Sequence, residues 1–274
     1  MTVPVTGHTT VTGIIGEPVA HSASPTIHNA AFQAQRLDWI YVAFPVRPGH
    51  VRAALEGLRA LGAAGCNVTM PHKREAALAC DHLEPTAATL GVVNTVCIRD
   101  ERLIGDSTDG AGFVDAARAV GVDVDASRIL VLGAGGAARA IVHAVRHAAA
   151  VQVWARRPDV AAAAAALADR ATVVPVEALE DAVGATDVVV NATPLGMHGE
   201  APPFDAAQLH AGQTVIDAVY APPETPLLAA AREHGATPLN GLGMLVHQAA
   251  RSFTLLTGCD APVDAMWAAA RGVA

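Results

Sequence analysis

Short apolar segments with the character of β-strands alternate with helical segments along the second half of this chain. A strand over 129–132 leads into Gly133-Ala134-Gly135-Gly136 and a helix over 137–148. A further helix is predicted over 159–169, and further strands over 151–154, 172–176, 187–191 and 214–219. Strands separated by helices of this length predict a parallel sheet with helices on both faces. This half is therefore expected to be an α/β domain.

The first half predicts another α/β unit. Strands are expected over 12–16, 40–45 and 65–69, and helices over 50–61, from Ser24-Pro25 and from Pro71. Ser24 is expected to cap its helix, because serine is a preferred N-cap and proline suits the first helical position. Segments 92–98 and 102–105 predict a hairpin that turns at Asp100-Glu101. The expected domains are 1–110, completed by C-terminal helices over 241–274, and 111–240.

The composition excludes several classes of protein. Of the 274 residues, 52% are hydrophobic and 16% are charged, which is too apolar for a disordered chain. The net charge is −8 and there is no basic run, so nucleic acid and membrane surfaces are poor partners. The longest apolar run, 160–168, is too short for a bilayer span, and no basic residue precedes Arg36 as in a secretory leader. A cytoplasmic enzyme or binding protein is expected.

The glycines after the strand at 129–132 predict a dinucleotide site. In Gly133-x-Gly135-x-x-Ala138, Gly133 permits a tight turn and Gly135 lets the backbone approach a pyrophosphate. The N-terminus of the following helix favours negative charge. The alternative is a glycine-rich turn that binds nothing.

The end of the next strand indicates which dinucleotide binds. An NAD site offers a carboxylate to the ribose 2′-hydroxyl there, whereas an NADP site offers arginine to the 2′-phosphate. This chain has Arg156-Arg157 after Trp154-Ala155, which favours NADP. Asp159 lies close by, and a solvated polar loop is the alternative.

Lys73 is the only lysine among the 18 basic residues, and the other 17 are arginine. Arginine stays protonated at any working pH, whereas a lysine can release its proton. Its isolation suggests that this position requires an ammonium group. Chance retention of one surface lysine is the alternative.

Seven short motifs follow one another along the chain. They are Gly16-Glu17-Pro18-Val19-Ala20-His21-Ser22-Ala23-Ser24-Pro25, Asn67-Val68-Thr69-Met70-Pro71-His72-Lys73, Val93-Asn94-Thr95, Thr108-Asp109-Gly110, Gly133-Ala134-Gly135-Gly136-Ala137, Asn191-Ala192-Thr193-Pro194-Leu195-Gly196-Met197 and Asn240-Gly241-Leu242-Gly243-Met244-Leu245-Val246. In this order they resemble the shikimate dehydrogenases, over about residues 13–257. Each motif alone is modest, but the ordered set is specific.

The resemblance implies an enzyme that interconverts 3-dehydroshikimate and shikimate with NADPH and NADP⁺. It implies an N-terminal α/β substrate domain and a Rossmann-type NADP-binding domain, with the active site in the cleft between them. The positions that match substrate contacts are Ser22, Ser24, Thr69, Lys73, Asn94, Asp109, Tyr220 and Gln248. The positions that match the cofactor site are Gly133, Ala134, Gly135, Gly136, Ala137, Ala155, Arg156, Arg157, Ala218 and Gly241.

The implied chemistry suits these residue types. Hydride reduction of a ketone leaves negative charge on oxygen, so a donor must pass a proton there. Lys73 can do so, and Asp109 would hold its ammonium. Ser22 and Ser24 would bind the carboxylate of the substrate, while Asn94, Thr69 and Gln248 would bind its hydroxyls.

Several of these residues also have plain structural interpretations. Ser24 and Asp109 both stand at expected helix starts, where either could be an N-cap. Gln248 could be a solvated helix residue, and Asn94 could satisfy a turn. Their joint occurrence with Lys73 favours function.

The chain departs from the family pattern at two places. Ser107 replaces the asparagine of Asn-Thr-Asp-Gly, and Ala155-Arg156-Arg157 replaces Asn-Arg-Thr. The second change keeps Arg156 and alters both residues that flank it. Both serines of Ser-x-Ser are present, which favours shikimate over the bulkier quinate.

Other functions were weighed against this one. His143 and His147 are four residues apart on one helix, but no third metal ligand is evident. There is no Gly-x-Ser-x-Gly or phosphate-binding Gly-Lys-Ser/Thr motif, so hydrolase and triphosphatase functions are disfavoured. A quinate or aminoshikimate dehydrogenase and a non-catalytic NADP-binding sensor remain as alternatives. A monomer and a homodimer are both left open.

Overall fold

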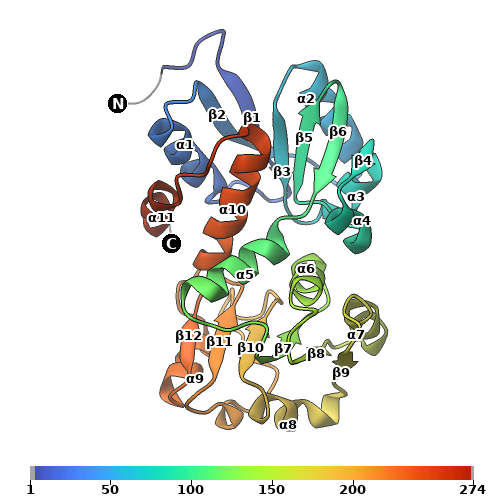
Figure 1. Cartoon of the computed structure of the whole chain (residues 1–274), viewed down its shortest axis with the longest axis vertical. Coiled ribbons are helices and arrows are strands. Elements are labelled where there is room, and N and C mark those ends of the chain that lie inside the picture. Colours follow the sequence, from blue (N-terminus) through green and yellow to red (C-terminus); the bar gives the residue numbers. More distant parts are fainter. Residues whose placement is uncertain (1–3, 273–274) are drawn as a thin grey trace. The chain divides into compact units, whose positions relative to one another are not determined.

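The structure is a computed structural model that describes residues 4–272. It divides into two compact units (Figure 1). The first contains the described residues up to Thr108 and those from Val246 onward, and the second runs from Asp109 to Leu245. The sequence analysis set these boundaries at 110 and 241. Residues 1–3 and 273–274 of the expected first domain lie outside the described residues.

The first unit contains a mixed sheet with strand order β2-β1-β3-β5-β6-β4. Strands β2 and β3 run parallel to β1, whereas β5 is antiparallel to both β3 and β6. The bounds are β1 Thr10–Gly16, β2 Trp39–Pro45, β3 Gly65–Val68, β4 His82–Leu83, β5 Thr95–Arg99 and β6 Arg102–Asp106. The β5–β6 hairpin turns at Asp100 and Glu101, both at positive φ, as the sequence predicts. Two such residues match the twist of the flanking strands.

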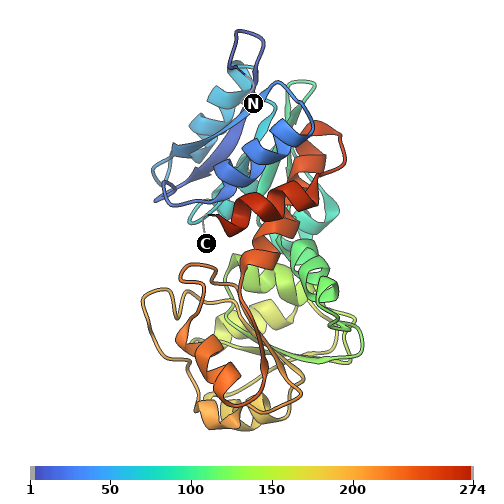
Figure 2. The same ribbon diagram turned by 90° about the vertical axis from the view of Figure 1, so that its left-hand side faces the viewer.

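Helices cover both faces of this sheet. Their bounds are α1 Ser24–Ala34, α2 Val51–Ala60, α3 Lys73–Ala79, α4 Pro85–Leu90, α10 Leu242–Thr257 and α11 Val263–Arg271. The C-terminal α11 lies beside α1 (Figures 1 and 2). The buried rings of Phe32 on α1 and Phe253 on α10 have centroids 5.6 Å apart. The C-terminal helices α10 and α11 thereby pack against α1 in this unit.

The second unit contains a wholly parallel sheet with strand order β12-β11-β10-β7-β8-β9. The strands are β7 Arg128–Leu132, β8 Ala150–Trp154, β9 Ala171–Val173, β10 Val188–Asn191, β11 Thr214–Asp217 and β12 Thr237–Leu239. The helices are α5 Asp109–Ala119, α6 Gly136–Ala144, α7 Pro158–Ala165, α8 Leu179–Gly184 and α9 Pro226–Glu233, with 3₁₀ turns η1 Val176–Ala178 and η2 Ala206–Gln208. The chain winds outward from β7 to β9 and then returns to β10 on the other side of β7. This reversal is the point at which ligands bind in open α/β sheets.

The second unit buries its sheet on both faces. Ile129 and Val131 of β7 belong to one apolar cluster, whereas Leu130 and Leu132 belong to another. Alternate residues of a strand point to opposite faces, so each cluster occupies one side of the sheet. This two-sided burial explains why the strands of this unit appear in the sequence as continuous apolar runs.

Several expected elements differ from the structure. The prediction that Ser24 caps its helix is wrong, because Ser24 is the first residue of α1 and Ala23 occupies the N-cap without a side-chain hydrogen bond. Helices α6 and α7 end earlier than expected, at Ala144 and Ala165. The short elements β4, α4, α9 and β12 were not predicted. Strands of two or three residues such as β4 and β12 are defined by neighbouring strands, so periodicity does not reveal them.

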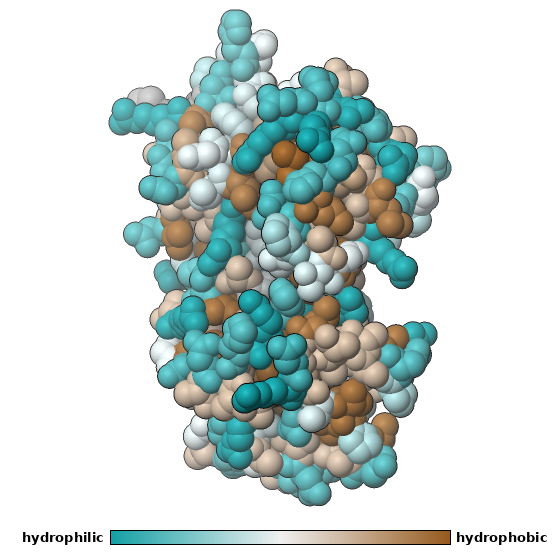
Figure 3. Space-filling model, turned by 45° about the vertical axis from the view of Figure 1, so that its right-hand side comes forward, coloured by the Kyte–Doolittle hydropathy of each residue, from teal (hydrophilic) through white to brown (hydrophobic). Residues whose placement is uncertain are grey.

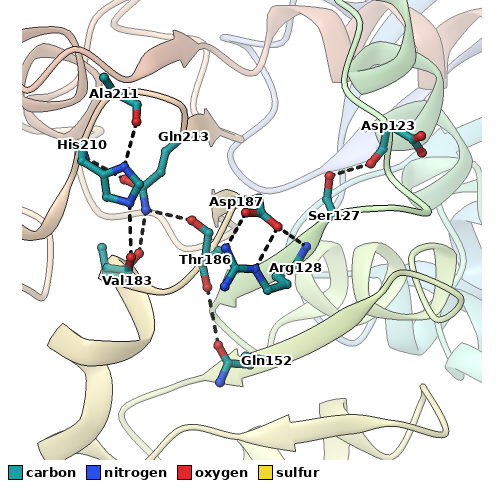
Figure 4. A network of polar contacts seen from close by, with 11 residues as sticks. Asp123, Ser127, Arg128, Gln152, Val183, Thr186, Asp187, His210, Ala211 and Gln213 are labelled. Atoms are coloured by element: carbon teal, nitrogen blue, oxygen red, sulfur yellow. Dashed lines mark hydrogen bonds and ion pairs between the residues drawn. The ribbon is translucent and has the colours of Figure 1, made fainter.

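Polar contacts join the amino ends of β7 and β10 (Figure 4). Both oxygens of the Asp187 carboxylate accept from Arg128, at 3.0 Å from Nε and 2.6 Å from Nη2, and the Arg128 backbone N–H donates at 2.8 Å. The amide of Gln213 donates to the carbonyls of Val183 and Thr186 at 2.7 and 2.9 Å. The hydrogen bonds from Arg128 lower the pKa of Asp187 to about 2.

The exposed large apolar side chains are distributed over both units. They are Val5, Val11, Leu61, Met70, Leu78, Val120, Val173 and Val176. Figure 3 shows one face, on which hydrophobic side chains form small groups among hydrophilic ones. Within residues 4–272, none of the helices has the length and apolar character needed to cross a bilayer.

Replacing Asp187 by asparagine should lower the melting temperature by about 1–3 °C at neutral pH, because an exposed ion pair contributes little. The folded-state pKa of Asp187 lies below its ordinary value of 3.8. Its contribution is therefore present above that value and is lost as the pH falls through about 2. Urea unfolding of both proteins at decreasing pH measures this difference. Asp169→Asn, at an exposed site, is the control, and a wild-type advantage that persists undiminished in acid would contradict the assignment.

Candidate active site

The segment after β1 carries the two serines of the Ser-x-Ser motif. The Ser22 backbone N–H donates to the Val19 carbonyl at 3.0 Å, which closes a turn. The Ser24 backbone N–H donates to the Ser22 hydroxyl oxygen at 3.3 Å. Ser22 is half-buried and Ser24 is buried at the start of α1. The two serines therefore lie two residues apart in the sequence, at the turn that leads into α1.

The chain leaves β3 in a tight turn that places Lys73. The Thr69 backbone N–H donates to the Ile15 carbonyl of β1, and the His72 N–H donates to the Thr69 carbonyl, both at 3.0 Å. The His72 ring nitrogen Nε2 lies 2.6 Å from the Val46 carbonyl oxygen, which holds the turn against the end of β2. Lys73 follows as the first residue of α3 and is half-buried. Thr69 and Lys73 thus lie at the carboxyl end of a central strand.

Beside this turn lies a buried group of polar side chains, which we call the amide–hydroxyl cluster. Its members are Asn67, Asn94, Thr95, Thr108 and Ser252. The Asn67 amide nitrogen donates to the Asn94 carbonyl, to Thr95 Oγ1 and to Ser252 Oγ at 2.9–3.1 Å. Its oxygen accepts from the buried Tyr41 hydroxyl at 2.8 Å. Burial raises the pKa of that hydroxyl.

The cluster fixes the orientation of Asn94. Asn94 Oδ1 accepts from the Thr108 backbone N–H at 2.8 Å, so Nδ2 is the donating atom. Nδ2 donates to Thr108 Oγ1 at 2.9 Å and to Gln248 Oε1 at 3.4 Å. The structure therefore brings Asn94 and Gln248 together, and Gln248 is more than a solvated helix residue. Asn94 thus satisfies a backbone N–H that is 14 residues away in the sequence, and it also contacts a second candidate residue.

Ser107, which departs from the family pattern, lies next to this cluster. Its backbone N–H donates to Asp106 Oδ1 at 2.7 Å. Among the described residues, its buried hydroxyl oxygen has no hydrogen-bond partner. The serine thus leaves a polar atom unsatisfied where the family has the longer asparagine.

The second unit begins with Asp109, which is buried and is the first residue of α5. The glycine loop follows β7 in the same unit. Gly133 has φ +116°, and a Cβ there would lie 2.9 Å from the Ala192 carbonyl oxygen, so only glycine fits this turn. Gly135 is the exposed N-cap of α6, and a Cβ built on it would meet nothing within 4 Å. Gly136 and Ala137 open the helix behind it.

This open space at a helix N-terminus fits a dinucleotide pyrophosphate. The first N–H groups of α6 lack partners within the helix and favour an anion. The loop also stands next to the reversal between β7 and β10. Gly133, Ala134, Gly135, Gly136 and Ala137 could hold the phosphates through backbone contacts.

The segment after β8 carries the predicted phosphate-binding arginines. Ala155 is half-buried, whereas Arg156 and Arg157 are exposed. Arg157 Nη2 lies 3.5 Å from Asp159 Oδ2 in an exposed ion pair. Asp159 thus contacts a predicted cofactor residue, which the sequence analysis had raised only as a neighbour.

The carboxyl ends of β10 and β11 hold a fully buried carboxylate, Asp217. It accepts from Asn191 Nδ2 at 2.9 Å, from the Val219 backbone N–H at 3.0 Å and from Thr225 Oγ1 at 2.7 Å. Burial raises the pKa of Asp217, and these three hydrogen bonds oppose that rise. Ala218 follows directly, and Tyr220 is half-buried in the same loop.

Sequence reasoning missed the residues that support these sites. They are Tyr41, Asn67, Thr95, Thr108 and Ser252 in the first unit, and Asn191, Thr225 and Asp217 in the second. Asn67, Thr95, Thr108 and Asn191 lie inside motifs quoted above, Asp217 directly precedes the candidate Ala218, and Ser252 follows Gln248 by one helical turn. These positions were the available signals, and Tyr41 and Thr225 had none. Over residues 4–272, no group of three or more His, Cys, Asp or Glu side chains is arranged to hold a metal ion.

Comparison with known proteins gives consistent matches over the whole chain. A family model described as the shikimate dehydrogenase substrate binding domain matches residues 14–96, and one described as the shikimate 5′-dehydrogenase C-terminal domain matches 241–271. Residues 128–221 match a model described as NADP oxidoreductase coenzyme F420-dependent. A shikimate dehydrogenase (NADP⁺) of Methanothermobacter thermautotrophicus is 42% identical over 272 residues, which cover 96% of each chain.

Two solved structures have the same fold. A shikimate dehydrogenase in complex with NADP⁺ has a TM-score of 0.92 at 34% identity, with 99% of this chain and 98% of that chain covered. The shikimate 5-dehydrogenase of Thermus thermophilus, in complex with NADP(H) and shikimate, has a TM-score of 0.89 at 35% identity. The coverage there is 97% of this chain and 100% of the other.

Replacing Gly135 by valine should weaken NADPH binding at least tenfold, because the side chain would fill the space offered to the pyrophosphate. Gly135 has φ −74°, which any residue adopts, so the melting temperature should change by no more than about 3 °C. Isothermal titration calorimetry and thermal unfolding measure the two effects. Gly57→Ala, at another glycine with open space around it, is the control. Unchanged NADPH affinity in Gly135→Val would refute the loop assignment.

Proposed function

This chain belongs to the shikimate dehydrogenase family, and we propose that it catalyses the reversible NADPH-dependent reduction of 3-dehydroshikimate to shikimate. The reaction leads toward chorismate and the aromatic amino acids. The observation that carries the proposal is the placement of the single lysine. Lys73 stands at the carboxyl end of β3, in the same unit as the serines and the amide–hydroxyl cluster. A fold alone would not assign an activity, but this donor among polar side chains does.

The polar side chains of the first unit suit a polyhydroxy ring acid. Ser22 and Ser24, which share one turn, bind the carboxylate of the substrate. Thr69, Asn94 and Gln248 bind its hydroxyls, and the bond between Asn94 and Gln248 sets the two amides relative to each other. Tyr220 of the second unit adds a further substrate contact.

The chain supplies the proton of the reaction. When bound, NADPH supplies the hydride that adds to the carbonyl carbon. The Lys73 ammonium donates a proton to the carbonyl oxygen as negative charge develops there, and it regains a proton from solvent. Asp109 orients the ammonium group. In the reverse direction, neutral Lys73 accepts the hydroxyl proton of shikimate, a step that arginine could not perform.

The second unit holds the cofactor. The loop from Gly133 to Ala137 binds the pyrophosphate, and Ala218 and Gly241 border the nicotinamide through their backbones. The exposed Arg156 binds the 2′-phosphate, with Ala155 and Arg157 flanking it. Guanidinium–phosphate pairing explains the preference for NADP over NAD.

Replacing Lys73 by alanine should slow shikimate oxidation by at least ~10²-fold, because the proton donor is lost. NADPH affinity should stay within twofold of wild type, since Lys73 lies outside the cofactor loops. Initial rates with shikimate and NADP⁺, followed at the reduced-nicotinamide absorbance band, measure the effect. Arg74→Ala, at the exposed neighbouring cation, should retain full activity.

The same assay tests the substrate. Shikimate should be oxidised faster than the bulkier quinate, because both serines of the Ser-x-Ser motif are present, and aminoshikimate is assayed beside them. A wild-type protein that binds NADPH but oxidises none of the three would instead be a cofactor-binding sensor. Turnover of Lys73→Ala at the wild-type rate would remove Lys73 from the mechanism.

Replacing Arg156 by alanine should weaken NADP⁺ binding by roughly ten- to a hundredfold, the effect of losing charge-assisted hydrogen bonds to phosphate. Binding of NAD⁺, which lacks that phosphate, should change less than twofold. Titrations with both cofactors give the comparison, and Arg170→Ala is the matched control at another exposed arginine. Equal losses for NADP⁺ and NAD⁺ would overturn the 2′-phosphate assignment.

Two further parts of the proposal concern location and assembly. The cytoplasm is proposed as the compartment, which agrees with four free cysteines within the described chain. A homodimer is proposed because β2, an outermost strand of its sheet, is an uncharged strand of seven residues. Free edges usually carry charges that prevent pairing. Light scattering over a range of concentrations distinguishes a dimer from a monomer.

A further inference from the structure

Among the described residues of the second unit, Asp217 is a buried acid to which no role has been given above. It stands at the end of β11 with no exposed surface. Each of its three donors comes from a different place in the chain: the end of β10, its own loop and the start of α9. The carboxylate therefore joins three segments at the carboxyl edge of the sheet.

Other hydrogen bonds fix the orientation of the side chains that donate to Asp217, so the carboxylate between them acts as an acceptor. Asn191 Oδ1 accepts from the Thr193 backbone N–H at 3.1 Å and from its hydroxyl at 2.6 Å, which directs Nδ2 toward Asp217. The Thr225 oxygen accepts from the Leu228 backbone N–H at 3.4 Å, which leaves its proton for Asp217. The third donor is the Val219 backbone N–H. An ionised carboxylate accepts from all three, because Oδ1 faces Asn191 and Val219 and Oδ2 faces Thr225. An amide has a single accepting oxygen, so Asp217→Asn would lose the acceptor on one of these two sides.

The loop held by Asp217 contains Ala218 and contacts Gly241, and these are the two positions proposed to border the nicotinamide. Ala218 follows Asp217, and its N–H donates to the Asn191 carbonyl at 2.8 Å. The Gly241 N–H donates to the Val219 carbonyl at 3.0 Å. A Cβ on Gly241 would lie 2.2 Å from the Ala218 carbonyl oxygen, so these backbones are in close contact. A small displacement at Asp217 would be transmitted to both.

We propose that Asp217 is a positioning residue that sets the loops at Ala218 and Gly241 for the nicotinamide end of the cofactor. This proposal rests on the function proposed above. Asp217 touches neither substrate nor cofactor in this scheme and acts through the loops that it holds. The Asn191 amide also donates to the Leu195 carbonyl at 3.0 Å, so the segment after β10 is held by the same unit.

Asp187 offers a matched comparison at the opposite end of the same sheet. It too is an aspartate that accepts from a side chain and a backbone N–H, and it lies just before β10. Its partner Arg128 is the first residue of β7, whereas the glycine loop follows the last residue of that strand. Asp187→Asn therefore reports what a purely structural carboxylate loss does to this unit.

The experiment compares Asp217→Asn with Asp187→Asn in the full chain. Measurements are the melting temperature, the dissociation constant of NADPH by calorimetry, and kcat with shikimate and NADP⁺. Asp217→Asn should raise the NADPH dissociation constant about tenfold and lower kcat by roughly ten- to a hundredfold, because misplacement of an oriented group has effects of this size. Asp187→Asn should leave both within twofold of wild type while lowering the melting temperature.

Two milder variants keep the test decisive if Asp217→Asn does not fold. Thr225→Val removes one donor and should weaken NADPH binding to a smaller extent, whereas Thr225→Ser keeps the hydroxyl and should restore it. NADPH affinity equal to wild type in Thr225→Val and in folded Asp217→Asn would overturn the proposal. Failure of the wild type to oxidise shikimate would instead refute the proposed function, and the NADPH titrations would still decide the role of Asp217.

Discussion

Polar groups buried at the carboxyl ends of strands must find partners without water, and both units of this protein are organised around that requirement. In the first unit, Asn67 distributes its two donor hydrogens among three acceptors, on Asn94, on β5 and on α10, and it accepts from Tyr41. In the second, Asp217 collects three donors from three segments. Each arrangement leaves neighbouring side chains or backbones in one defined orientation. The groups proposed for binding stand beside these satisfied centres.

The use of arginine and lysine in this chain shows why the proposed proton transfer depends on one residue. Arginine serves wherever a permanent cation suffices, as at Arg128 beside Asp187 and in the proposed role of Arg156. Lysine occurs once, where the proposed reaction must both give and take a proton. The Asn94–Gln248 contact shows that candidate residues far apart in sequence lie together in the first unit. In the proposed mechanism, the single lysine of the chain supplies and accepts the proton.

The departures from the family pattern have distinct physical consequences. Ser107 is too short to make the contacts of an asparagine, and its buried hydroxyl is unsatisfied among the described residues. Arg157 replaces a threonine and pairs with Asp159 on the surface. The first change places an unsatisfied hydroxyl oxygen beside the amide–hydroxyl cluster. The second change adds the Arg157 cation near the proposed 2′-phosphate position. The ion pair with Asp159 partly neutralises the charge of that cation.

The sequence alone determined the α/β class, the order of the main strands, the glycine loop and the family, because these depend on local periodicity and on short motifs. It also identified Lys73 by its isolation. Only the tertiary structure decided that Ser24 begins α1 without capping it, and that Asn94 contacts Gln248. The same holds for Asp217, whose donors at Asn191, Val219 and Thr225 come together only when β10, β11 and α9 pack. These hydrogen-bond partners depend on the order of the strands in the sheet and on the orientation of each side-chain amide. Neither property can be recognised from the periodicity of the sequence.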